Sequence, residues 1–512
     1  MTLLTPLGLD FGTAMLVAVL LPMIGAVLLA LVGRWPNLRE TVTLTTAVAL
    51  FITVLHLVGG YLAGEAPKLV LFDVVPGIPL AFRLEPLGVI FSLVASGLWI
   101  ITSLYAIGYM RGNDEKHQTR FYACFAIALG AAMGIAFADN LLTLFIFYEV
   151  LTLSTYPLVA HKETPEARRG ARIYLGILLA TSIGLLLPAI IWTYAVAGTG
   201  DFQMGGILEG KIDEALLPIL LGLYMFGIGK AALVPIHPWL PHAMVAPTPV
   251  SALLHAVAVV KAGVFTVLKV TVYVFGTDFL SSTDASVWLM WIAAFSIVFA
   301  GIIAMTKDNL KARLAYSTVS QLSYVTLGAM LASGYGVTAG ALQIMMHATA
   351  KITLFMCAGA IYVATHKTEL SQMDGLGRKM PWVYGAFTVG ALAIIGIPPL
   401  GGDWVKLYLV MAATDSGQQY IIYPLILASL LSIGYLLPVV ARGFFGNLGD
   451  REEPAAQFND AMPPEERVRA PRLTVIAPVI TAALCFVPVP RRAAQGIDRA
   501  PHWCALGSLI DV

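Results

Sequence analysis

Six ionisable residues interrupt long apolar stretches of this 512-residue chain, and their types suit the movement of protons. They are Glu149, Lys230, Lys261, Lys269, Lys351 and Lys406. An ionisable side chain is expensive in hydrocarbon, so it normally faces a protein interior or a water-filled cavity. Because such residues recur in several stretches, the sequence predicts a buried relay for protons or ions.

Two histidines extend this pattern. His255 precedes Lys261 in one stretch, and His347 lies four residues before Lys351 in another, a spacing that places both side chains on one helical face. Histidine changes charge near neutral pH, which suits a relay. Lys269 differs, because it lies near the end of its stretch, where a lysine can extend to the membrane interface instead.

Glu149 needs a partner if it remains charged in an apolar environment, and Lys230 is the natural candidate. Their attraction would keep both side chains charged, and a proton drawn onto the glutamate would leave the lysine ready to release one. A buried ion pair can also be purely structural, which is the alternative reading of these two residues.

The composition indicates a polytopic membrane protein. Hydrophobic residues make up 58% and charged residues 12%, with a mean hydropathy of +0.81. A helix needs about 20 apolar residues to cross the hydrocarbon core. We therefore predict an all-α protein of about fourteen transmembrane helices, with centres near residues 23, 51, 97, 129, 150, 185, 225, 261, 296, 323, 350, 396, 431 and 480. No basic region precedes the first stretch, so we expect no cleaved signal peptide.

Two of the predicted helices are interrupted by prolines. Helix 7 meets Pro235 and Pro238, and helix 12 contains Pro398 and Pro399. Proline removes a backbone donor and clashes with the preceding turn, so both helices should be broken. Each break falls in the fourth helix of a set of five, helices 4–8 and 9–13, a pattern typical of transporters built from two inverted repeats. The alternative is a pair of kinks that serve packing alone.

The predicted organisation is a single membrane domain over residues 1–512. We assign 1–115 to helices 1–3, 116–275 to the first repeat, 285–442 to the second repeat, 443–470 to a polar cytoplasmic loop, and 471–512 to the final helix and tail. The polar loop is interpreted as a solvated linker or as a docking surface for a partner subunit.

Charge in the connecting loops predicts the orientation. Twenty Lys and Arg residues fall in the odd-numbered loops and three in the even-numbered loops. Since positively charged loops remain cytoplasmic, we expect a bacterial-type cytoplasmic (inner) membrane protein with both termini outside. The net charge of +1 gives no indication of a nucleic-acid partner.

No motif for a cofactor or a metal is evident. The cysteines are scattered without metal-type spacing, at Cys124, Cys357, Cys485 and Cys504. There is no glycine-rich nucleotide loop and no haem motif. We therefore predict no cofactor, no metal and no redox centre in this chain. Whether it serves an enzyme is left open, since it could belong to a translocase complex of the NADH-quinone oxidoreductase type.

Several stretches together resemble one known family. They are Phe145–Ser154, Lys230–Gly263, Leu310–Tyr324, His347–Gly359 and Gly375–Lys406. Over roughly residues 80–440 the chain resembles the antiporter-like family shared by respiratory complex I and the multisubunit Mrp cation/proton antiporters. Within that family it is most similar to the Mrp D subunit, particularly in Asp374–Pro381 and in the run to Gly396–Pro399.

The resemblance implies fourteen helices, two inverted five-helix repeats and a hydrophilic axis at mid-membrane depth. It places the family's helix 5 glutamate at Glu149 and its lysines of helices 7, 8 and 12 at Lys230, Lys261 and Lys406, with His347 and Lys351 at its polar positions in helix 11. The chain departs from the family before Lys406, where Asp403 and Trp404 follow Gly402 instead of Gly-Phe. Asp403 could pair with Lys406 or form part of a cation site.

The favoured function is a proton-translocating, antiporter-like component of a multisubunit complex, most similar to the Mrp D subunit. Its expected partners are other membrane subunits, the lipid bilayer and protons, with Na⁺ or K⁺ as candidate cations. One alternative is a proton-pumping subunit of a complex I-like oxidoreductase or a membrane-bound hydrogenase. Another is a membrane coupling partner or scaffold, for example in an inorganic-carbon uptake complex.

Overall fold

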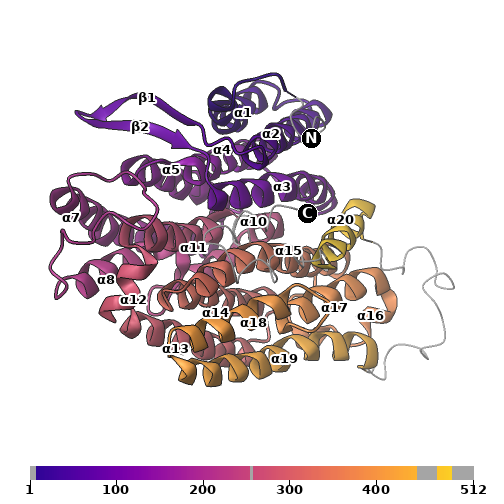
Figure 1. Ribbon diagram of the computed structural model, residues 1–512. Helices are drawn as coiled ribbons and strands as arrows, with labels where there is room; N and C mark the ends of the chain where they lie inside the picture. The colour runs from indigo at the N-terminus through magenta and orange to yellow at the C-terminus, as the bar shows by residue number, and fades with distance from the viewer. Residues whose placement is uncertain (1–6, 254–257, 447–469, 487–512) are drawn as a thin grey trace.

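The computed structural model describes residues 7–253, 258–446 and 470–486, and these are mainly helical. Long helices lie side by side from α1 and α2 at one edge to α19 at the other (Figure 1). The predicted loop 443–470 falls largely outside the described residues, as do both chain termini. The predicted orientation of the termini therefore remains a prediction.

The N-terminal part contains three long helices and one hairpin. Its elements are α1 (Phe11–Leu31), α2 (Pro36–Leu62), β1 (Lys68–Val75), β2 (Ile78–Arg83) and α3 (Pro86–Gly112). Asp10 caps α1 by accepting a bond from the backbone N–H of Thr13 at 2.8 Å, and proline opens α2 and α3. The antiparallel hairpin corrects the all-α prediction, because a connection expected to be a loop forms two strands.

The middle of the chain alternates long helices with short segments. Its elements are α4 (Gln118–Phe137), α5 (Leu141–Val159), α6 (Pro165–Thr181), η1 (Ser182–Leu186), α7 (Leu187–Ala197), α8 (Leu217–Gly227), η2 (Gly229–Ala231), α9 (Trp239–His242), η3 (Ala243–Val245), α10 (Thr248–Leu253), α11 (Val259–Val270), η5 (Thr271–Phe275) and α12 (Thr277–Thr283). Asn140 caps α5 through the backbone N–H of Thr143 at 2.8 Å.

The last part again consists of long helices joined by short segments, with a break between α17 and α18. Its elements are α13 (Val287–Thr306), α14 (Leu310–Met330), α15 (Gly334–Thr365), η6 (Leu370–Gln372), α16 (Leu376–Lys379), α17 (Pro381–Ile395), α18 (Gly402–Asp415), η7 (Gln419–Ile421), α19 (Ile422–Phe445), α20 (Arg472–Ala483) and η9 (Leu484–Phe486). Asn309 and Ser333 cap α14 and α15 through their side-chain oxygens.

The two segments that the sequence predicts to be broken by prolines are both irregular. Helix α8 ends at Gly227, and the chain passes through the short η2 before Pro235 and Pro238. Helix α17 ends at Ile395, where Gly396 takes a left-handed conformation with φ +82°, and α18 begins after Pro398 and Pro399. A left-handed residue ends a helix at little cost when it is glycine.

Nine helices of the described part are long and apolar enough to cross a membrane, or ten if one bent pair counts as a single crossing. Of the fourteen predicted centres, thirteen fall within helices, and residue 396 falls at the break between α17 and α18. Several of these helices are too short or too interrupted to qualify alone, including α8 and α17. The count of fourteen crossings, the two inverted repeats and the domain boundaries remain predictions.

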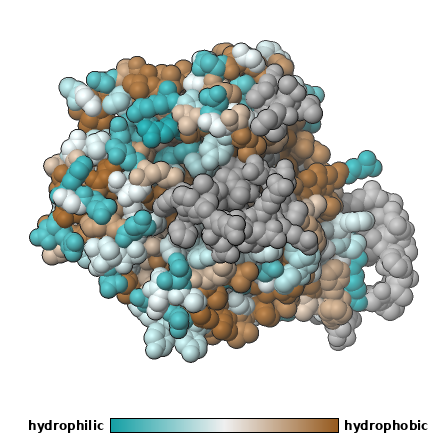
Figure 2. Space-filling model, viewed as in Figure 1, coloured by the Kyte–Doolittle hydropathy of each residue, from teal (hydrophilic) through white to brown (hydrophobic). Residues whose placement is uncertain are grey.

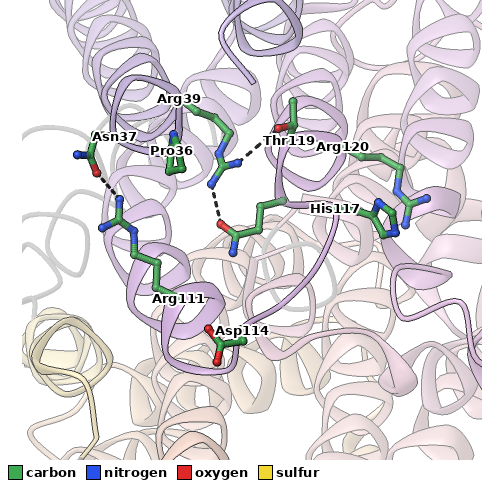
Figure 3. Close-up of a pocket in the computed structure, with 9 residues that line it drawn as sticks. Pro36, Asn37, Arg39, Arg111, Asp114, His117, Thr119 and Arg120 are labelled. Carbon is green, nitrogen blue, oxygen red and sulfur yellow. Dashed lines mark hydrogen bonds between the residues drawn. The ribbon is translucent and has the colours of Figure 1, made fainter. Parts of the chain in front are cut away.

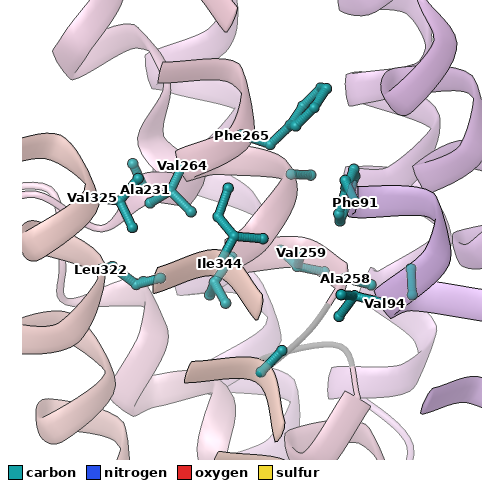
Figure 4. Close-up of a cluster of buried hydrophobic side chains, with 14 of the residues drawn as sticks. Phe91, Val94, Ala231, Ala258, Val259, Val264, Phe265, Leu322, Val325 and Ile344 are labelled. Carbon is teal, nitrogen blue, oxygen red and sulfur yellow. The ribbon is translucent and has the colours of Figure 1, made fainter. Parts of the chain in front are cut away.

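Apolar side chains fill the interior and also reach the surface. Buried side chains from α3, α11, α14 and α15 pack together in the middle of the molecule (Figure 4). On the outside, hydrophobic residues form broad patches between hydrophilic ones (Figure 2), and large apolar side chains of α1, α13 and α19 are exposed. Exposed apolar faces of this extent fit contact with lipid or with partner subunits.

Candidate functional site

Lys230 lies in the break after α8 and is completely buried. Its Nζ donates to the backbone carbonyl of Tyr148 at 2.9 Å and to Oγ1 of Thr152 at 2.6 Å, both on α5. It also lies 3.1 Å from the centroid of the Tyr148 ring. A buried ammonium needs such partners, and the break of the helix brings Lys230 to the α5 surface.

Glu149 does not make the contact expected from the sequence. No salt bridge within 4.0 Å joins it to Lys230, and neither carboxylate oxygen has a hydrogen-bond partner among the described residues. Lys230 instead contacts Tyr148 and Thr152, which are one turn apart on α5 and share a face that Glu149 does not occupy. Glu149 is therefore beside the lysine's binding surface but does not pair with it.

Lys261 and His347 meet in the middle of the molecule. Nζ of Lys261, on α11, contacts Nδ1 of His347, on α15, and both side chains are buried. The helices that carry them also contribute to a cluster of buried apolar side chains (Figure 4), in which the rings of Phe91 and Phe265 stack at 5.0 Å. Two titratable nitrogens thus form a polar contact inside a hydrocarbon-like core.

Gly263 brings α11 against the break that carries Lys230. A Cβ added at Gly263 would overlap the backbone of Lys230 and Ala231. Because Lys261 lies two residues before Gly263, this close approach places the Lys230 region and the Lys261–His347 contact beside the same turn of α11. The sequence gives no reason to single out Gly263 from the other glycines of the chain.

A small cavity continues from His347 towards Lys406. It has a volume of about 10 Å³, close to the space of one water molecule, and is lined by Gln321, Tyr324, Gln343, Met346, His347, Ala393, Ile394, Gly402, Val405 and Lys406. Among the described residues, the buried Nε2 of His347 has no hydrogen-bond partner. A polar, water-sized space therefore separates the histidine from the last lysine.

Lys406 reaches back from α18 across the helix break. Its Nζ donates to the carbonyl of Ile395, the last residue of α17, and to Oγ of Ser429 on α19 at 2.9 Å. The end of a helix leaves carbonyls without partners and carries partial negative charge, so a cation is favoured there. The break in α17 thus creates the binding place for Lys406.

Asp403 does not pair with Lys406, contrary to the sequence-based expectation. Its Oδ1 accepts a bond from the backbone N–H of Trp404 at 2.8 Å, in the first turn of α18. A carboxylate in the first turn of a helix is stabilised by the free N–H groups there. This local contact accounts for the position of the carboxylate. We therefore do not include Asp403 in the buried proton relay predicted from the sequence.

Lys351 lies one turn after His347 on α15 but contacts other groups. Its Nζ donates to Oγ of Ser317 at 2.6 Å and to the carbonyl of Leu314 at 3.2 Å, both on α14. Ser317 in turn donates to the hydroxyl of Tyr435 at 3.0 Å. Lys351 therefore begins a hydroxyl network towards α19, while His347 faces Lys261. His255 lies outside the described residues.

Lys269 is buried, so the expected extension to the interface is wrong. Its Nζ forms an ion pair with Glu85 and donates to the carbonyl of Ala138 at 2.6 Å. The adjacent Asp139 pairs with Lys68 and Arg83, each at 2.7 Å. In the sequence Glu85 and Asp139 resemble ordinary residues at helix ends, so no signal linked them to Lys269.

Comparison with known proteins gives a consistent family. Residues 138–432 match the family described as "NADH:quinone oxidoreductase/Mrp antiporter, TM". The A/B component of a probable K⁺/H⁺ antiporter of Rhizobium meliloti is 32% identical over 73% of this chain, although the match spans 38% of that relative's length. The N component of the NADH-quinone oxidoreductase of Desulforudis audaxviator is 30% identical over 71% of this chain and 72% of its own.

Two solved structures share the fold. The membrane-bound sulfane sulfur reductase, an archaeal respiratory membrane complex, contains a chain with a TM-score of 0.80 and 22% identity, covering 98% of this chain and 97% of that one. The Mrp complex from Dietzia sp. contains a chain with a TM-score of 0.76 and 23% identity, covering 97% of this chain and 52% of that one.

Proposed function

The chain belongs to the NADH:quinone oxidoreductase/Mrp antiporter transmembrane family, and we propose that it carries protons along a buried axis within a multisubunit membrane complex. Membership in this family establishes that the chain is an antiporter-like membrane subunit. The observation that supports the proton path is the contact of Lys261 with His347, which leads through a water-sized cavity to Lys406.

The proposed path has three parts. Lys230, in the break after α8, lies against the turn of α11 that holds Gly263 and gives protons access to Lys261. The Lys261–His347 contact then passes a proton from one nitrogen to the other. The cavity beyond His347 leads to Lys406, which is partly exposed at the second break.

Three further residues have supporting roles in this proposal. Lys351 and its bond to Ser317 provide a branch towards α19. Glu149 acts on Lys230 through its charge at a distance beyond direct pairing. His255, outside the described residues, is proposed from the sequence alone as a member of the path near Lys261.

Within the family we propose the Mrp antiporter role, with this chain in the position of the D component and with Na⁺ or K⁺ exchanged for protons. The support is the resemblance of Asp374–Pro381 and Gly396–Pro399 to that component. The alternative is a proton pump driven by redox chemistry in other subunits, supported by the relative that is part of an NADH-quinone oxidoreductase.

Partner identification separates these two functions. The chain is tagged, purified from its native membranes in mild detergent, and its partners are identified by mass spectrometry. An antiporter should contain further membrane subunits and should dissipate a pH gradient in vesicles when Na⁺ or K⁺ is added. Co-purifying iron–sulfur subunits, together with no response to either cation, would contradict the antiporter role and support the pump.

A further inference from the structure

A basic cleft opens where α2 and α4 begin and α3 ends, outside the proposed path. Its volume is about 860 Å³, and it is lined by Pro36, Asn37, Arg39, Arg111, Asp114, His117, Gln118, Thr119 and Arg120 (Figure 3). Three arginines and one histidine thus line it together with a single carboxylate. This excess of positive charge is the first indication of an anion site.

Two of the three arginines are neutralised by carboxylates behind the cleft. Arg111 is held by both oxygens of Glu40, at 2.8 and 2.6 Å. Arg120 donates to Glu163 at 2.7 Å. These two side chains keep their positions in the cleft wall through their pairs, but their charges are largely balanced.

Arg39 is different, because its hydrogen-bond partners are neutral. It donates to Oε1 of Gln118 at 2.6 Å and to Oγ1 of Thr119 at 3.4 Å, while its contact with Glu40 is 3.9 Å long. Arg39 is only 6% exposed, and its buried Nε has no hydrogen-bond partner among the described residues. The guanidinium also lies over the Tyr122 ring, 5.4 Å from its centroid, but a buried guanidinium with an unpaired donor remains costly unless an anion completes it.

Two helix N-termini at this cleft add to its preference for an anion. Pro36 and Asn37 are the first residues of the 27-residue α2, and Gln118 and Thr119 are the first of the 20-residue α4. Neither helix has a side-chain cap bond or an acidic residue in its first turn. The free N–H groups and the positive ends of both dipoles therefore favour a bound anion.

Apolar side chains beside the cleft indicate which kind of anion fits. A second hollow of about 500 Å³ is lined by Trp35, Pro36, Asn37 and Leu38, so it shares two residues with the basic cleft. Trp35 and Leu38 are 60% and 46% exposed. A free inorganic anion makes no favourable contact with an exposed apolar surface, whereas the acyl chain of a lipid can cover it.

We propose that this cleft binds the phosphate head group of an anionic phospholipid, which Arg39 and the two helix N-termini contact while an acyl chain lies over Trp35 and Leu38. Basic pockets between membrane helices are a recurrent type of site for anionic lipid head groups. The bound phosphate would supply the charge partner that Arg39 otherwise has only at 3.9 Å.

The test measures lipid binding by the full-length chain, purified with its partner subunits and depleted of lipid. Native mass spectrometry follows binding of palmitoyl-oleoyl phosphatidylglycerol, with the corresponding phosphatidylcholine and sodium phosphate as comparison probes. The variants are Arg39→Gln, which removes the cation whose carboxylate contact is 3.9 Å long, and Asn37→Asp, which adds a carboxylate at an exposed position. Arg169→Gln, an exposed arginine of α6, is the matched control.

Loss of one charge-assisted bond should weaken phosphatidylglycerol binding about tenfold in Arg39→Gln. Asn37→Asp should weaken it similarly while raising the melting temperature of the lipid-free protein, because an acid favours the first turn of α2. Arg169→Gln should bind as the wild type does. Equal phosphatidylglycerol binding by all variants would overturn the proposal, and displacement of the lipid by millimolar sodium phosphate would overturn the lipid assignment.

Discussion

Nζ of Lys261 and Nδ1 of His347 are in direct contact between α11 and α15. When the lysine is protonated it donates to Nδ1, and the neutral imidazole then carries its hydrogen on Nε2. That nitrogen has no hydrogen-bond partner among the described residues, and His347 lines the cavity that leads to Lys406. A proton accepted at Nδ1 is thereby balanced by a proton released at Nε2.

This geometry predicts that His347 must be able to carry a proton, since a hydrogen-bonding side chain alone cannot replace it. His347→Gln retains an acceptor for Lys261 but cannot exchange a proton, so transport in vesicles should fall by at least about tenfold, within the range attributed to a positioned proton-transfer group. Protein level and melting temperature should change little. His242→Gln, at an exposed histidine of α9, serves as control. Wild-type transport in His347→Gln would remove the histidine from the path.

The break in α17 predicts different consequences for two charged neighbours. Lys406→Met removes the side chain that bonds Ile395 and Ser429 and lines the cavity, so it should abolish transport. Asp403→Asn should leave the pH profile of transport unchanged, because its carboxylate binds the backbone of Trp404. A shifted profile in Asp403→Asn, recorded in the same vesicles, would show that Asp403 acts on Lys406 after all.

Gly263 should tolerate no side chain. Gly263→Ala places a methyl group against the backbone of Lys230, so it should lower stability by about 1–3 kcal/mol, as overpacking does, and impair transport. Gly176→Ala in α6 is the matched control, because nothing lies within 4 Å of its added Cβ, and it should stabilise by about 1 kcal/mol. Thermal unfolding in detergent measures both. A stabilising Gly263→Ala would show that α11 does not approach Lys230 so closely.

The sequence identified the buried charges correctly but not all of their partners. Lys230, Lys261 and Lys351 are buried as predicted from their apolar surroundings. Partners such as Thr152 and Ser317 could not be predicted, because hydroxyl residues are common in membrane helices and hydrogen-bond their own backbone equally well. Their role depends on which helices are neighbours.

Two direct pairs of opposite charge expected from the sequence do not form, and both for the same physical reason. The expected pairs of Glu149 with Lys230 and of Asp403 with Lys406 assumed that opposite charges near one another will meet. The structure instead gives both lysines backbone carbonyls and hydroxyls. Carbonyls freed at a helix break, as at Ile395, compete with carboxylates for an ammonium, and only the folded arrangement decides between them.

We predict that the folded protein loses stability in acid because His161 is buried. Burial and the nearby Arg120 lower the pKa of His161, in the loop after α5, to about 4. Because the unfolded chain binds a proton at its ordinary pKa of 6.5, stability contributed by neutral His161 is present above about pH 6.5 and is lost as the pH falls towards 4. The loss from pH 7 to 4.5 should be on the order of 2 kcal/mol.

A variant isolates this effect from other acid-sensitive groups. His161→Phe retains a ring beside Phe121, whose ring lies 5.7 Å from that of His161, and removes the titration. Its melting temperature should fall less between pH 7 and 4.5 than that of the wild type. An equal fall in both proteins would show that His161 is not the group that titrates.

Proton transport by a Lys230→Met variant tests the central claim most directly. The variant and the wild type are purified with their partner subunits, reconstituted into vesicles and compared by a fluorescent pH-gradient assay, with Lys116→Met, an exposed lysine, as control. The buried axis predicts that Lys230→Met abolishes transport while the complex still assembles and Lys116→Met transports normally. Normal transport by assembled Lys230→Met complexes would contradict the account and indicate that this chain serves as a scaffold.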